Sequence, residues 1–148
     1  MSLYIDTIKK ISIGTGWVAS NSSQKDLTFS NDTGTLTLFN VTGDVIVKLI
    51  PVITTDLVPN TSANASLGVV GATQSMIVNS DVTGLDARGI WVDQTPDNEI
   101  EPFDRIRSYI VTDGNDVVLT LSAQVNSGAI SFYCFWDALS SDGFVSVA

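Results

Sequence analysis

Hydrophobic and polar positions alternate most clearly between residues 116 and 139. The first part of this stretch has a period of two, which is typical of a strand with one buried face. Its inward set is Val117, Leu119, Leu121, Ala123 and Val125. Three turn-forming residues follow at 126–128, Asn-Ser-Gly, and then a return run rich in large β-forming side chains. The pattern therefore predicts a long antiparallel hairpin with its turn at 126–128.

The return run of this predicted hairpin carries aromatic side chains on both faces. In a strand, Phe132 and Trp136 point one way, and Tyr133 and Phe135 point the other way. A strand that is apolar on both faces is covered on both. We therefore predict that Tyr133 and Phe135 contact a second sheet, a loop or another subunit.

Turn signals divide the rest of the chain into short apolar runs without a sustained 3.6-residue period. Residues 19–26 are read as a polar loop, and Pro51 is expected at a bulge or a sheet edge because it lacks an N–H donor. The predicted fold class is all-β, a β-sandwich or jelly-roll-like domain of about eight to ten short antiparallel strands over residues 14–148. The expected further strands lie at 27–29, 35–41, 45–54, 65–70, 75–78, 90–92 and 109–112.

The first thirteen residues form a separate apolar segment that ends before Gly14. Helical spacing relates Ile5, Ile8 and Ile11, so a helix is one alternative. The β-branched residues favour an extended arm or edge strand over residues 1–13. We expect this arm to contact a neighbouring molecule, and its candidate contact residues are Leu3, Tyr4, Ile5 and Ile8.

The composition of the chain argues against several classes of protein. With 44% hydrophobic and 16% charged residues, the chain is not of the disordered type. A net charge of -9 argues against nucleic-acid partners, which require a basic surface. No apolar run is long enough for a membrane helix, and the N-terminus lacks a signal-peptide layout, so we expect synthesis in a cytoplasm and no membrane partner.

Few residues suggest catalytic or metal-binding chemistry. The chain has no histidine, and no nucleotide, zinc or nucleophile motif is present, so we expect no catalytic residue and no cofactor. The lone Cys134 is read as a small buried hydrophobe. An acidic loop at 93–104 carries five acids that could bind calcium, although its spacing is not that of an EF-hand and a solvated loop is the simpler reading. These acids are Asp93, Asp97, Glu99, Glu101 and Asp104.

Two further groups of residues suggest other functions. Glu99 and Glu101 are the only glutamates and offer a carboxylate pair for glycoside hydrolysis, but they fall in one loop. The aromatic residues could form a sugar-binding platform, although aromatics on strands more often belong to the core. The six residues concerned are Trp17, Trp91, Phe132, Tyr133, Phe135 and Trp136.

Three segments carry a family resemblance. They are residues 37–47 (TLFNVTGDVIV), residues 68–96 with GVVGATQSMIV and GIWVDQTP, and residues 128–148 (GAISFYCFWDALSSDGFVSVA). Their order resembles a group of small proteins encoded among the head genes of tailed bacteriophages. The chain departs from the group's pattern at Asp137-Ala138 and in the loop 94–107.

The resemblance implies a non-enzymatic virion component, a capsid decoration or cement protein on the outside of a phage head. Its expected partners are the major capsid protein and other copies of itself, as a homotrimer inferred from capsid three-fold positions. A receptor- or glycan-binding module of a head or tail fibre is the alternative from a different class. A small hydrolase is the third.

Overall fold

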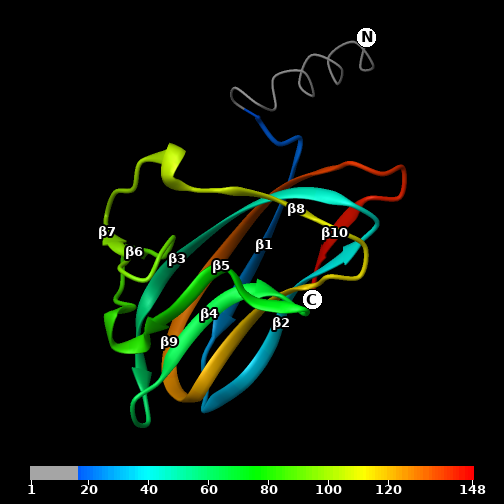
Figure 1. Ribbon diagram of the computed structural model, residues 1–148. Coiled ribbons are helices and arrows are strands. Elements are labelled where there is room, and N and C mark those ends of the chain that lie inside the picture. The colour runs from blue at the N-terminus through cyan, green and yellow to red at the C-terminus, as the bar shows by residue number, and fades with distance from the viewer. Residues whose placement is uncertain (1–16) are drawn as a thin grey trace.

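The computed structural model describes residues 17–148, which form one antiparallel sheet of ten strands with two single-turn 3₁₀ helices (Figure 1). The all-β prediction is confirmed. Because all strands belong to one open sheet, the predicted sandwich or jelly roll is not confirmed. The elements are β1 (Asn21–Thr28), β2 (Asp32–Thr42), β3 (Val45–Pro59), β4 (Asn64–Val69), β5 (Ala72–Asp81), η1 (Val82–Gly84), β6 (Gly89–Ile90), β7 (Asp97–Asn98), η2 (Phe103–Arg105), β8 (Ser108–Val111), β9 (Val117–Ala138) and β10 (Phe144–Val147).

The strand β9 organises the sheet, and its form corrects the prediction of a hairpin. It is a single strand of 22 residues that passes through 126–128 without reversing. Its first part lies between β2 and β4, and its second part lies between β1 and β3 (Figure 1). β9, β3 and β2 are therefore much longer than the short strands that the sequence predicted.

The three turn-forming residues 126–128 bend β9 instead of ending it. Gly128 has φ 121°, a conformation that side chains with a Cβ rarely adopt. Its carbonyl accepts from the Phe29 N–H at 2.9 Å, and the Asn126 carbonyl accepts from the Asn31 N–H at 3.3 Å. β3 has register shifts opposite this bend, between Ile53 and Pro59. Because neighbouring segments satisfy the backbone here, the strand stays paired through the bend.

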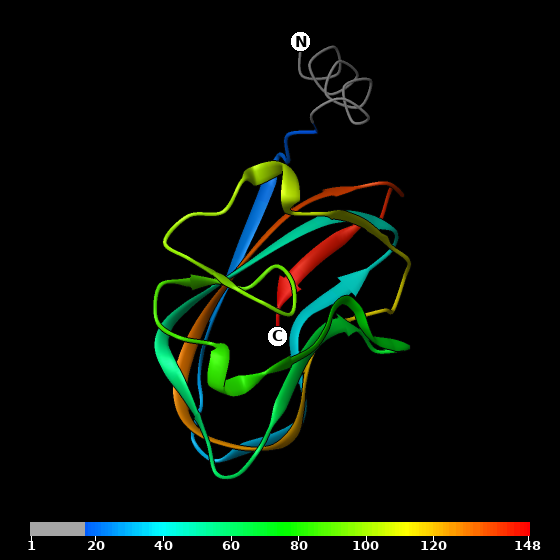
Figure 2. The same ribbon diagram turned by 60° about the vertical axis from the view of Figure 1, so that its left-hand side comes forward.

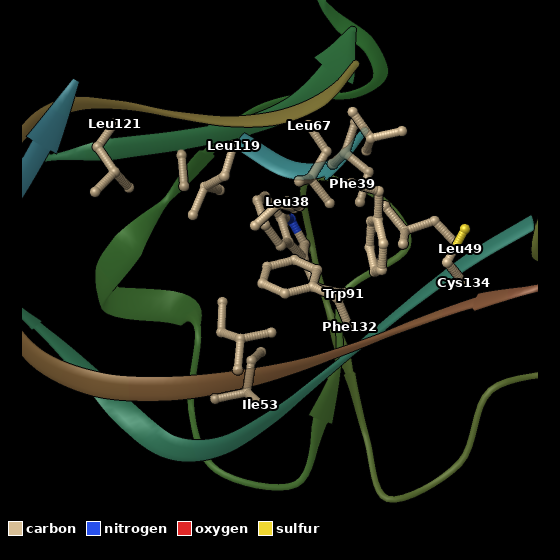
Figure 3. Packing of buried hydrophobic residues seen from close by; sticks show 14 of the residues in the cluster. Leu38, Phe39, Leu49, Ile53, Leu67, Trp91, Leu119, Leu121, Phe132 and Cys134 are labelled. Carbon is tan, nitrogen blue, oxygen red and sulfur yellow. The ribbon is translucent and has the colours of Figure 1, made fainter. Parts of the chain in front are cut away.

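The bend folds the sheet around one hydrophobic core (Figures 2 and 3). The first part of β9 contributes Leu119 and Leu121, and the second part contributes Phe132 and Cys134 to the same cluster. Trp91 is also fully buried and donates from Nε1 to the Ser80 hydroxyl at 2.9 Å. The core therefore contains the apolar residues of both halves of β9, as a sheet curled over itself requires.

Several strands lie where the sequence predicted none or a shorter one. The polar residues 19–26 were expected to form a loop, but β1 begins at Asn21 and pairs with β9 along its whole length. The reason is tertiary: Leu27 packs against the core, and pairing with β9 holds the polar residues of β1. β10 likewise pairs with β2 in the tail of the chain.

Pro51 lies within β3 at a place that tolerates a missing donor. It is paired with Phe132 of β9. On its other side, its carbonyl accepts from the Trp91 N–H at 3.0 Å. The β8 ladder ends at Lys48 and the β6 ladder begins at Val52, so the position without an N–H falls in a gap between ladders. Pro51 therefore lies at a break between the β8 and β6 ladders, within an interior strand and without a bulge.

Cys134 is buried in the core, as predicted, and burial raises the pKa of its thiol from 9.0 to about 12. In the unfolded chain the thiol releases its proton at a lower pH than in the folded chain. The contribution of the protonated thiol to the free energy of unfolding is therefore fully present below pH 9 and is lost as the pH rises towards 12. A shift of this size corresponds to about 4 kcal/mol.

We predict that the free energy of unfolding of the wild type falls steeply above pH 9, and that Cys134→Ala removes most of this fall. Urea denaturation at pH 7, 9 and 11 measures it. If the free energy of unfolding falls equally with pH in the two proteins, the Cys134 thiol does not cause the loss of stability at high pH.

Candidate functional site

The outer face of the sheet, opposite the core, carries an unusual share of apolar side chains over β8, β3 and β9. In the ladder of β3 with β9, Lys48 lies opposite Phe135 and Ile50 lies opposite Tyr133. On the other side of β3, Ile110 of β8 lies opposite Ile46. Paired residues share a face, and the alternate residues Val45 and Val47 belong to the core. The side chains of the paired residues named first therefore point away from the core.

Two segments add further apolar side chains to this surface. Val18, just before β1, is 67% exposed, and Phe103 of η2 is 62% exposed. Ile110 is 71% exposed on the same side of the sheet. We call the set Val18, Ile50, Phe103, Ile110, Tyr133 and Phe135 the apolar face. Exposed apolar groups gathered on one side of a protein are typical of an interaction surface.

A groove of about 250 Å³ lies in the apolar face. One wall is the segment before β1, which Asp137 fixes in place: Trp17 donates from Nε1 to its Oδ2 at 2.9 Å, and the Ser20 N–H contacts its carboxylate. The other residues come from β3, β9 and η2. Figures 1 and 2 place η2 at the end of the molecule where β1 begins. The lining residues are Trp17, Val18, Ala19, Lys48, Ile50, Phe103 and Phe135.

Lys48 is the one charged residue of the groove lining. It is only 9% exposed, and its Nζ lies 4.0 Å from the centroid of the Phe103 ring. This is a cation–π contact, which offsets part of the cost of removing the ammonium group from water. Burial lowers the pKa of Lys48 from its usual value of 10.5.

The residues predicted as contacts divide into two groups. Tyr133 and Phe135 are half-buried on the outer face, with Phe135 in the groove. Leu3, Tyr4, Ile5 and Ile8 lie outside the described residues, so their role as contacts stays a prediction.

Of the other groove residues, only Trp17 was indicated by the sequence, as one of the aromatic residues considered for a sugar platform. Lys48 was identifiable as an outward-facing residue of a strand, but nothing in its neighbours indicated that it would be covered. Phe103 gave no signal, because it lies in an acidic loop without a recognisable period.

The acidic loop forms ion pairs with arginines. Arg105 contacts Asp93 and Glu101, each at 3.0 Å, and Arg88 contacts Glu99 at 3.2 Å. Among residues 17–148, no group of three or more acidic, histidine or cysteine side chains is arranged to hold a metal ion. The two glutamates contact different arginines, Glu99 with Arg88 and Glu101 with Arg105.

The six aromatic residues considered as a sugar platform do not all lie on one surface. Trp91, Phe132 and Trp136 are buried, whereas Trp17 and Phe135 line the groove. Sugar recognition needs polar groups aimed at hydroxyls. The groove lining is apolar apart from Lys48 and the indole N–H of Trp17, which is bonded to Asp137. This lining suits an apolar protein segment better than a glycan.

The comparisons with known proteins identify a fold. No family model and no curated protein matches the sequence. Among solved structures, a chain in the acidic stable capsid structure of Helicobacter pylori bacteriophage KHP30 has a TM-score of 0.51 and 14% sequence identity. The match covers 88% of this chain and 97% of that chain. The two chains therefore share a fold over almost the whole of the phage chain.

Within residues 17–148, we find no helix long and apolar enough to cross a membrane.

Proposed function

We propose that the chain is a structural virion protein: a capsid decoration or cement protein that binds the outer surface of a phage head and stabilises it. The observation that carries the proposal is the fold shared with a chain of a phage capsid structure over 97% of that chain's length. The resemblance of residues 37–47, 68–96 and 128–148 to phage head-gene products supports it independently.

The apolar face suits this role. Exposed Val18, Phe103 and Ile110 offer contact area of the kind that becomes buried when proteins assemble. In this proposal the partners are the major capsid protein and further copies of the chain, as a homotrimer at three-fold positions. The role requires no catalytic residue and no cofactor, and it places the protein in the virion.

The mechanism is mass action. A protein that binds an assembled shell, and binds the separate subunits weakly, shifts the equilibrium towards the shell. At a free concentration of one hundred times Kd, each bound site adds roughly 2.7 kcal/mol to the stability of the assembled state. The net charge of -9 also limits adhesion to packaged DNA.

The test uses capsid shells of the encoding phage, prepared without this protein. We expect added protein to sediment with the shells, to saturate, and to raise their temperature of disruption as occupancy rises. Shells that remain without bound protein at micromolar concentration would contradict the proposal. Binding to a glycan array without binding to shells would favour the receptor-binding alternative.

A further inference from the structure

The ammonium group of Lys48 has no acidic partner within residues 17–148. The side chain is nine-tenths buried, and the contact found for its Nζ is the ring of Phe103. No ion pair joins it to a carboxylate of the described residues. A partly desolvated ammonium group without an opposite charge is costly, and a carboxylate bound in the groove would offset part of that cost. Lys48 therefore offers a pairing position for an anionic group.

The residues around Lys48 limit which kind of ligand can bring an anionic group to it. Trp17 and Val18 form one side, and Ile50 and Phe135 lie along the sheet beside Lys48. A fitting segment has one acidic side chain with an apolar side chain on each side of it, all on the same face. A free anion would leave the apolar walls uncovered.

The N-terminal arm of this chain has that pattern. In an extended segment, Tyr4, Asp6 and Ile8 fall on one face, since successive side chains alternate. Asp6 is the only acidic residue before Trp17. The chain outside the described residues is sixteen residues long and ends beside Trp17, a wall of the groove.

We propose that the groove binds the arm Leu3–Ile13 of a neighbouring copy of the chain, with Asp6 paired to Lys48 and with Tyr4 and Ile8 on the apolar walls. This inference rests on the proposal that copies of the chain assemble with one another. It does not depend on binding to a shell.

The length of the arm supports exchange between copies. Extended, residues 3–13 span roughly 35 Å. A segment of this length can reach well beyond the groove beside Trp17, and so can meet the groove of a neighbouring copy. Each copy then donates one arm and receives another. Such head-to-tail contacts close into a ring when the rotation between copies allows it.

Disulfide trapping in the full chain tests the arrangement. One variant combines Tyr4→Cys with Ile50→Cys, and a second combines Ile8→Cys with Ile50→Cys, because either arm residue can lie beside Ile50 depending on strand direction. We expect one of them to form covalent dimers or larger species at least tenfold faster than its control. In each control, Val70→Cys replaces Ile50→Cys, since Val70 is 58% exposed and is not among the groove residues.

The pairing of Asp6 with Lys48 has its own test. Adding Asp6→Lys to the faster variant should reduce trapping to the control rate, and adding Lys48→Glu to that protein should restore it. Non-reducing electrophoresis measures the rate of disulfide trapping for every variant and control. Equal rates for the groove and control variants, or only disulfides within one chain, would overturn the inference. Since no shell is present, this outcome is distinct from a failure to bind capsids.

Discussion

Replacing Gly128 with alanine is expected to lower the free energy of unfolding by roughly 3–5 kcal/mol, a large part of the stability of a small domain. Two causes act together. The φ of 121° disfavours any residue with a Cβ. A Cβ at this position would also lie 2.7 Å from the Asp56 carbonyl oxygen and 2.7 Å from Leu57 Cα, both of which are backbone atoms of β3. The backbone of β3 or β9 must shift to admit it.

Gly84→Ala is the matched control for this substitution. No atom lies within 4 Å of a Cβ built at Gly84, and its φ is not in the left-handed region. We expect it to change stability by less than ~1 kcal/mol. Urea denaturation of both variants measures the difference. If Gly128→Ala is as stable as Gly84→Ala, the bend in β9 does not have the conformation described.

Introducing two aspartates on the apolar face, at Val18 and Ile110, is expected to weaken binding to capsid shells at least a hundredfold while the fold remains stable. The two residues are 67% and 71% exposed. Substitutions at such positions usually change stability by less than ~0.5 kcal/mol. A carboxylate buried in an apolar contact is costly, and a hundredfold loss corresponds to about 2.8 kcal/mol.

Val70→Asp is the control for this pair: it adds one negative charge, where the pair adds two, at a residue of similar exposure outside the apolar face. We expect it to bind shells like the wild type. Sedimentation with shells over a concentration series gives the Kd, and thermal denaturation verifies the fold. If the double variant binds as tightly as Val70→Asp does, the apolar face is not the capsid contact.

The alternation of side chains allowed the fold class to be predicted, because period two is a local property of the sequence. The same signal identified the two faces of β9: Phe132 and Trp136 are buried in the core, and Tyr133 and Phe135 face outwards. The path of the chain at 126–128 could not be predicted. Asn-Ser-Gly suits a turn as well as a bend, and the pairing with β2 and β3 decides between them.

The strand β1 illustrates a second limit. Its polar sequence has no hydrophobic run, yet it is held by backbone hydrogen bonds to β9, which residue types do not encode. The groove was missed for a related reason. Trp17, Phe103 and Phe135 are far apart in sequence and meet only because Asp137 fixes the segment before β1 and because η2, at the end of the acidic loop, lies against the groove. Single residues were identifiable, but their assembly was not.

An electron-microscopy map of the intact virion of the encoding phage tests the proposed capsid role most directly. We expect density for the curled ten-stranded sheet of this chain on the outer surface of the head, with the apolar face turned towards a neighbouring protein. A head surface without this density, or density in which the apolar face points only to solvent, would contradict it.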